Sequence, residues 1–179
     1  HPEWPVGEGL SVRLQFTDRG LSGVVDDARL AGNPVQGLRV ELPDLKAPVL
    51  SLSLEAQAAE AKPLLALLRQ SPLRQKHAET LELLEVSGPA RVDVSMVLPL
   101  KRELGRPQYA GTVQLYGVDF RAEAWQLDFE ALEGQARFDA AGFTAPALVG
   151  RAHAAPVTAA LALGREHTGS TALLEASAR

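Results

Sequence analysis

The sequence contains no cysteine, and several other residue types and patterns are scarce. Without thiols, a cysteine-dependent enzyme, a disulfide-stabilised scaffold and a cysteine-ligated zinc site are all excluded. Aromatic residues make up only 5% of the chain, which argues against a surface that stacks nucleic-acid bases or sugar rings. The net charge is −4 and its signs are interspersed, so we expect no clustered basic face for nucleic acid.

Long apolar runs are missing as well. The uninterrupted apolar stretches are only a few residues long, whereas a helix that spans a bilayer needs about 20 apolar residues. The chain opens with HPEWPVGEG, which has no basic region, no apolar core and no initiator methionine. We therefore expect an internal fragment of a longer protein.

No group of residues typical of an active site is present in the sequence. The four histidines (His1, His77, His153 and His167) have no metal-ligand spacing such as HxxxH and no recognisable carboxylate partner. A GxSxG turn, a GxxxxGK loop and a GxGxxG loop are all absent. We predict that the chain is not an enzyme and uses no cofactor or metal ion.

The chain is rich in segments in which apolar and polar residues alternate. The longest region is YAGTVQLYGVDFRAEAWQLDFEALEGQARFD, residues 109–139, in which Trp125, Leu127 and Phe129 alternate with polar residues. Strict alternation places the apolar side chains on one face of a sheet. Further strands are predicted at 10–16, 21–30, 38–42, 50–54, 92–98, 143–149, 157–163 and 171–176.

One segment interrupts this alternation. From Ala58 to Leu84 the chain is rich in good helix formers, and Pro63 suits the first position of a helix. Ser71 and Pro72 end that helix and can begin a second one, which leaves open whether the pair plugs the apolar face or braces its back. The predicted fold is mostly β, with a first meander at 1–58, a helical pair inserted at 59–87 and a second meander at 88–179, together one continuous domain.

Four parts of the sequence resemble, in their order, the AsmA-like proteins of Gram-negative envelopes. They resemble the YhdP branch in particular, which is related more distantly to TamB. The four parts are HPEWP, PLLALLRQSPL, SGPARVDVSMVLPLK, and the run GTVQLYGVDFRAEAWQLDFEALEGQARFDAAGFTAPALVGRAHAAPVTAAL. Each part alone is a common pattern of helix, strand or turn, so the resemblance rests on the ordered set.

The resemblance implies both a fold and a function. Such proteins are anchored in the inner membrane by one helix and project into the periplasm. Their antiparallel strands form an elongated, curved, half-open sheet, a β-groove, whose concave face is apolar. They are implicated in moving phospholipid between the two membranes and carry no catalytic residues. We expect this chain to be a periplasmic segment whose edges pair with flanking segments of the same parent chain, and which self-associates through those edges when isolated.

Three interpretations of the apolar face are open. In the favoured one, phospholipid acyl chains lie on it. In the second, the face is the closed core of a structural or adhesive β-sandwich that binds a protein partner through its edges. In the third, a lipocalin-type barrel encloses a small ligand, which the helical insertion fits poorly. The candidate lipid-lining residues are Val92, Val94, Met96, Leu98, Val113, Leu115, Trp125, Leu127 and Phe129.

Overall fold

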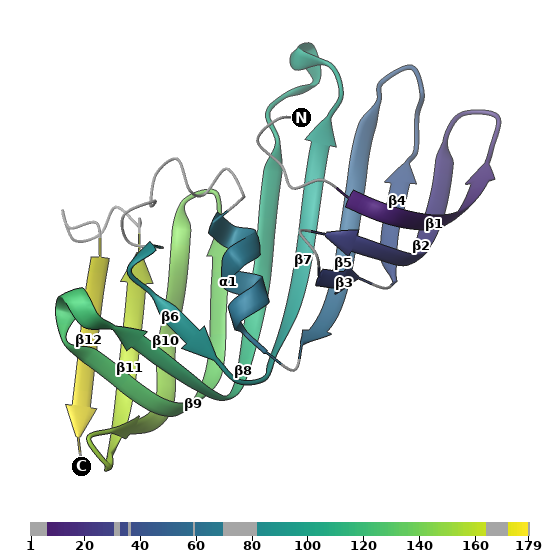
Figure 1. Cartoon of the computed structure of the whole chain (residues 1–179). Coiled ribbons are helices and arrows are strands. Elements are labelled where there is room, and N and C mark those ends of the chain that lie inside the picture. Colours follow the sequence, from purple (N-terminus) through teal and green to yellow (C-terminus); the bar gives the residue numbers. More distant parts are fainter. Residues whose placement is uncertain are drawn as a thin grey trace. The chain divides into compact units, whose positions relative to one another are not determined.

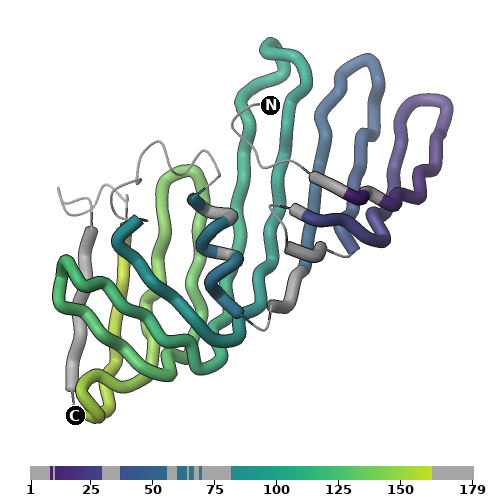
Figure 2. The backbone as a smooth tube through the Cα atoms, in the orientation of Figure 1, coloured from purple at the N-terminus to yellow at the C-terminus, as the bar shows by residue number. Residues whose placement is uncertain are grey.

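The fold is described from a computed structural model of the chain, drawn as a cartoon in Figure 1 and as a backbone tube in Figure 2. The structure describes residues 7–30, 33–35, 37–58, 60–69, 82–163 and 172–178. These residues form a mostly-β fold built on one open antiparallel sheet, which confirms the predicted fold class at this level.

Ten strands follow one another across the sheet in the order β1-β2-β4-β5-β7-β8-β9-β10-β11-β12, while β3 pairs with β2 and β6 pairs with β8. The elements are β1 (Gly7–Phe16), β2 (Leu21–Leu30), β3 (Asn33–Val35), β4 (Leu38–Leu42), β5 (Val49–Ala58), α1 (Lys62–Arg69), β6 (Glu85–Ser87), β7 (Ala90–Pro99), η1 (Arg102–Leu104), β8 (Gln108–Ala122), η2 (Glu123–Trp125), β9 (Leu127–Asp139), β10 (Gly142–Ala152), β11 (Ala155–Leu163) and β12 (Ala172–Ala178).

The chain divides into two compact units. The described residues of unit 1 lie within 57–91 and 112–179, and those of unit 2 lie within 7–56 and 92–111. Unit 1 therefore contains α1, β6, most of β8, and β9 to β12, while unit 2 contains β1 to β4 and most of β5 and β7. The predicted three-part organisation remains a prediction.

The strand register in unit 2 places its apolar side chains on one face. Val12 lies opposite Val25, and Val40 lies opposite Leu52. Residues that lie directly opposite each other in an antiparallel pair project to the same side of the sheet. The same rule places the polar pair of Arg39 and Ser53 on the other side. The sheet of unit 2 is therefore apolar on one face and polar on the other.

In unit 1, β-bulges keep the apolar side chains on one face although the alternation in the sequence changes phase. Val149 pairs with Glu133 but Arg151 pairs with Glu130, so β9 contains one extra residue at this point. That residue is Ala131, whose φ is 51°, and its N–H donates to the Asp119 carboxylate at 3.0 Å. The register of β10 also shifts, between 145 and 148, where Pro146 occupies a position that suits a bulge.

The main core of unit 1 lies on this apolar face. Its buried members are Phe129, Leu132, Ala136, Ala145, Leu148, Val157 and Ala159. Two smaller clusters lie at helix α1. Ala61, the residue before the helix, packs with Ala90 and Val118, and Leu65 of the helix packs with Leu84 and Ala122. The partly buried Phe120 contacts both the main core and the Leu65 cluster. Helix α1 therefore lies on the apolar side of β6 and β8.

Three local predictions were wrong. Trp125 belongs to the 3₁₀ turn η2 rather than to a strand, because Gln126 adopts a left-handed conformation (φ 53°) as the chain reverses from β8 into β9. Residues 85–87, assigned to the helical segment, form β6 because their backbone pairs with 119–121 of β8. The interval between the predicted strands at 21–30 and 38–42 contains a further short strand, β3, because Asn33 and Pro34 pair with β2.

Part of the predicted helical pair lies outside the described residues. Helix α1 occupies the place of the first predicted helix and begins one residue before Pro63. The second predicted helix, from Ser71 onward, falls mostly within 70–81, outside the described residues. The helical pair therefore remains a prediction.

Alanine substitutions at two glycines with positive φ allow the cost of steric crowding to be measured apart from the cost of backbone strain. A Cβ added at Gly134 (φ 139°) would lie 2.7 Å from the carbonyl oxygen of Ala147, whereas one added at Gly117 (φ 79°) would meet nothing within 4 Å. We expect Gly117→Ala to cost about 1–2 kcal/mol of unfolding free energy from backbone strain. Gly134→Ala should cost about 1–3 kcal/mol more because of overpacking. Urea unfolding of the 179-residue chain measures both, and equal losses would contradict this account.

Candidate functional site

The candidate site is the apolar face of unit 2, which we call the open face. It consists of the apolar side chains on one side of β1, β2, β4, β5 and the part of β7 in unit 2. The N–H of Leu100 donates to the carbonyl of Pro48 at 2.9 Å, which fixes the pairing of β5 with β7. Counting back in steps of two from that pair places Met96 opposite Leu52. The face is therefore continuous from β1 to β7.

Side chains of the open face are accessible to solvent. Val12, Leu14 and Phe16 on β1 are 42%, 46% and 68% exposed. The apolar residues of β5 from 49 to 54 are half-buried. Among the described hydrophobic side chains of unit 2, only Val25, Leu42 and Val92 are buried. Within unit 2, no described element covers this face.

Four of the nine predicted lining residues lie on the open face. Val92 is buried, whereas Val94, Met96 and Leu98 are half-buried, and all four lie on the same side of β7. Their neighbour Val97 projects to the opposite side and is 37% exposed. The alternation in β7 therefore places these four side chains on one face, and their contact with lipid remains a prediction.

The other five predicted lining residues belong to unit 1. Val113, Leu115 and Leu127 are half-buried against its hydrophobic clusters. Phe129 is 5% exposed, with its ring centroid 6.2 Å from that of Phe120. Trp125 is 42% exposed in η2 and is not part of the described clusters. The nine residues are thus divided between two units rather than gathered into one described site.

The predicted lining residues did not include any from strands β1, β2, β4 and β5, which also contribute to the open face. Leu14 on β1, Val40 on β4 and Leu52 on β5 share the side of the sheet that β7 presents. The signal was available, because the segments 10–16, 38–42 and 50–54 alternate as regularly as 92–98 does. Strand order was needed to show that they adjoin β7.

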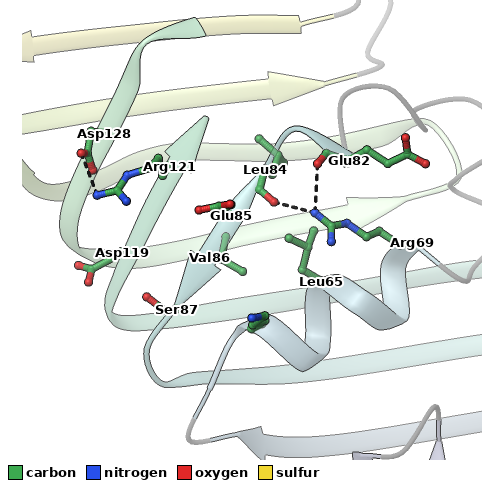
Figure 3. Close-up of a pocket in the computed structure, with 11 residues that line it drawn as sticks. Leu65, Arg69, Glu82, Leu84, Glu85, Val86, Ser87, Asp119, Arg121 and Asp128 are labelled. Atoms are coloured by element: carbon green, nitrogen blue, oxygen red, sulfur yellow. Dashed lines mark hydrogen bonds and ion pairs between the residues drawn. The ribbon is translucent and has the colours of Figure 1, made fainter. Parts of the chain in front are cut away.

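Unit 1 also contains a polar recess of about 510 Å³ beside α1, shown in Figure 3. Leu65, Leu84 and Val86 provide its apolar lining. Its charged lining comprises three cationic and four acidic side chains, namely Lys62, Arg69, Arg121, Glu82, Glu85, Asp119 and Asp128.

Two of the three cations in this recess are held by protein groups. Arg69 donates through Nη2 to the carbonyl of Leu84 at 2.7 Å and to that of Glu82 at 3.4 Å, as the dashed lines in Figure 3 show. Arg121 donates to the Asp128 carboxylate at 3.1 Å. That hydrogen bond, followed by charge attraction to Asp128 and Glu85, raises the pKa of Arg121 above its ordinary value. The hydrogen bonds of Arg69 therefore connect α1 to the segment 82–84 that leads into β6.

Neither unit presents a recognisable metal site or membrane helix in its described part. No group of three or more His, Asp or Glu side chains among the described residues is placed to hold a metal ion. None of the described helices combines the length and the apolar character that crossing a membrane requires.

The sequence matches the family described as YhdP protein over residues 1–176. Neither the curated proteins nor the solved structures yield a match to the chain.

Two phenylalanines distinguish the packed core from the open face. Phe129→Ala should lower the free energy of unfolding by about 3–5 kcal/mol, because it leaves a cavity in the unit 1 core. Phe16→Ala, at a residue 68% exposed, should change it by less than about 1 kcal/mol. Urea unfolding of both variants checks this, and a comparable loss at Phe16 would show that the open face is covered in solution.

Proposed function

The chain belongs to the YhdP family of lipid-transport-related proteins of the bacterial envelope, and from this membership we propose that it is a segment of a phospholipid conduit. In this proposal the open face of unit 2 binds acyl chains. The observation that carries it is an apolar sheet face across five strands, exposed on β1 and mostly half-buried on β2, β4, β5 and β7, and backed by a polar face. In the parent protein the sheet continues as an elongated, curved and half-open groove.

The width of the open face suits an acyl chain. Five neighbouring strands at about 4.8 Å spacing extend about 19 Å. One leaflet of a bilayer has half of the roughly 30 Å hydrocarbon thickness, so an acyl chain of about 15 Å fits across these strands. Each methylene buried on the face contributes about 0.8 kcal/mol, and aliphatic side chains offer no polar group that would hold a chain at one position. A chain can therefore bind and still slide.

The open face favours a groove over the closed alternatives. A β-sandwich needs a second layer over the apolar side of each sheet, and a lipocalin-type barrel needs that side enclosed. None of the described residues of unit 2 provides such a layer. The packed clusters of unit 1 then serve as a structural core rather than as the lipid surface.

The proposal includes a cellular setting and partners. The segment lies in the periplasm, in a parent protein anchored in the inner membrane, and it carries out no reaction and needs no cofactor. β1 and β12 end the described strand order, each with one hydrogen-bonded neighbour on that path. Unpaired strand edges readily accept a further strand, so flanking segments of the parent chain would pair there.

Photocrosslinking distinguishes the two faces of β7. A benzophenone amino acid at Met96 should crosslink to a short-chain phosphatidylglycerol added to the chain, because Met96 lies on the open face. The same group at Val97, which is also apolar but lies on the opposite face, should crosslink at least about tenfold less. Intact-mass spectrometry quantifies the adducts. Equal labelling at both positions would count against the proposed surface.

A charge placed on the open face should block lipid binding. Leu52→Glu puts a carboxylate where an acyl chain would lie, and an unpaired charge in an apolar environment is strongly unfavourable. We expect the lipid that copurifies with the chain to fall at least about fivefold, as measured by native mass spectrometry. Ser53→Glu adds the same charge on the polar face and should leave lipid binding unchanged. Circular dichroism would confirm that both variants fold.

A further inference from the structure

Three hairpin turns of unit 2 lie together at one end of its strands (Figure 1). They are residues 17–20 between β1 and β2, 43–48 between β4 and β5, and 100–107 between β7 and β8. The N–H of Leu45 donates to the carbonyl of Arg19 at 2.7 Å, which joins the first turn to the second. Lys101 Nζ donates to the carbonyl of Lys46 at 3.2 Å, which joins the second to the third. The turns therefore form one connected rim.

The rim is basic, although the chain as a whole is acidic. It contains five cationic and three acidic side chains, whereas the net charge of the whole chain is −4. All eight charged side chains are exposed. The cationic members of this basic rim are Arg19, Lys46, Lys101, Arg102 and Arg106, and the acidic members are Asp18, Asp44 and Glu103.

The basic rim retains its capacity to bind an anion. None of its five cations forms an ion pair with another described residue. One of its three acids is already engaged, since Asp44 accepts a hydrogen bond from the N–H of Lys46 at 2.8 Å. The guanidinium groups of Arg19, Arg102 and Arg106 match the geometry of a phosphate, to which arginine can donate two parallel hydrogen bonds.

Exposed apolar side chains connect the basic rim with the open face. Leu45 and Leu100, within the turns, are 52% and 56% exposed. Phe16, the last residue of β1 and 68% exposed, directly precedes the first turn. Cationic groups thus lie at the end of an accessible apolar surface. A molecule that complements this arrangement has an anionic group at one end and a hydrocarbon chain at the other.

We propose that the basic rim binds the phosphate of a phospholipid head group while the acyl chains of the same lipid lie on the open face. This inference rests on the proposed function and extends it, because it fixes which side of the groove carries the head groups. Exposed ion pairs contribute only a little each in water. The rim therefore favours phosphate-bearing lipids without holding any one of them in place.

The test compares two amphiphiles with identical tails. Dihexanoyl phosphatidylglycerol carries the phosphate, dihexanoylglycerol lacks it, and inorganic phosphate alone lacks the tails. Binding of each to the 179-residue chain is measured by isothermal titration calorimetry. The rim variant is Lys46→Gln/Arg102→Gln. The matched control, Arg29→Gln/Arg39→Gln, removes two exposed cations of the same unit that lie outside the rim.

We expect the rim variant to bind phosphatidylglycerol about three- to tenfold more weakly, since two exposed charge contacts are lost. Its affinity for dihexanoylglycerol should be unchanged, and the control variant should match the original chain with both amphiphiles. Raising the salt from roughly 0.05 M to 0.5 M should weaken phosphatidylglycerol binding to the original chain more than to the rim variant, because salt screens exposed charges.

Other results would overturn the inference in recognisable ways. If the rim and control variants lose phosphatidylglycerol binding equally, the rim is not the head-group site, although the open face still binds lipid. If inorganic phosphate binds as tightly as phosphatidylglycerol, the rim is a site for free anions. If the original chain binds neither amphiphile, the proposed function itself fails.

Discussion

The strand register of this sheet gathers most apolar side chains on one face, and the rest of the structure depends on that constraint. Shifting any strand by one residue would exchange its apolar and polar sides. The register of unit 2 satisfies the constraint by simple alternation, as the pairs Val12–Val25 and Val40–Leu52 show. In unit 1 the sequence changes phase, and bulges absorb the extra residues so that Phe129 and Leu132 still face the same core. One face of each unit is therefore apolar throughout.

The two units differ in how far the apolar face is buried. In unit 1, α1 packs on the apolar side through Leu65, and the side chains of β9 to β11 form a buried cluster. In unit 2, the described side chains of the corresponding face remain half-buried or exposed, with three exceptions. An apolar surface of this extent is unfavourable in water unless something covers it. The packed unit is then a structural support, and the unpacked unit presents the surface for which lipid binding is proposed.

Much of the fold followed from the sequence because its local signals agree. The strand from Leu21 to Leu30 was predicted with its observed bounds, since the turn-forming residues Gly20 and Gly32 flank it in the sequence. The bulge at Ala131 could not be predicted, because it depends on the side chain of Asp119, which lies twelve residues earlier in the chain. Strand β6 was missed for a similar reason, since Glu85–Ser87 has little local β character and is ordered by pairing with β8.

The candidate site was predictable only in part. Alternation identified the face of β7, but the same alternation in β8 and β9 leads into a packed core. A strand pattern indicates which side chains share a face, whereas burial depends on what lies above that face. That information comes from tertiary packing, here from α1 and from contacts among β9, β10 and β11. The basic rim could likewise not be predicted from the sequence, because its cations come from three turns that are distant along the chain and meet only in the folded sheet.

The hydrogen bond between Asp119 and the N–H of Ala131 has a consequence for how such a chain folds. A sheet assembled from many strands of similar alternating sequence offers many nearly equivalent ways to pair them. Hydrophobic contacts alone discriminate poorly between these pairings when they differ by two residues, because the same face stays apolar. A carboxylate that meets one particular unpaired amide is satisfied in only one alignment. Polar contacts at bulges thus help to specify the correct strand register. Their contribution becomes more important as the number of similar strands, and hence of competing pairings, increases.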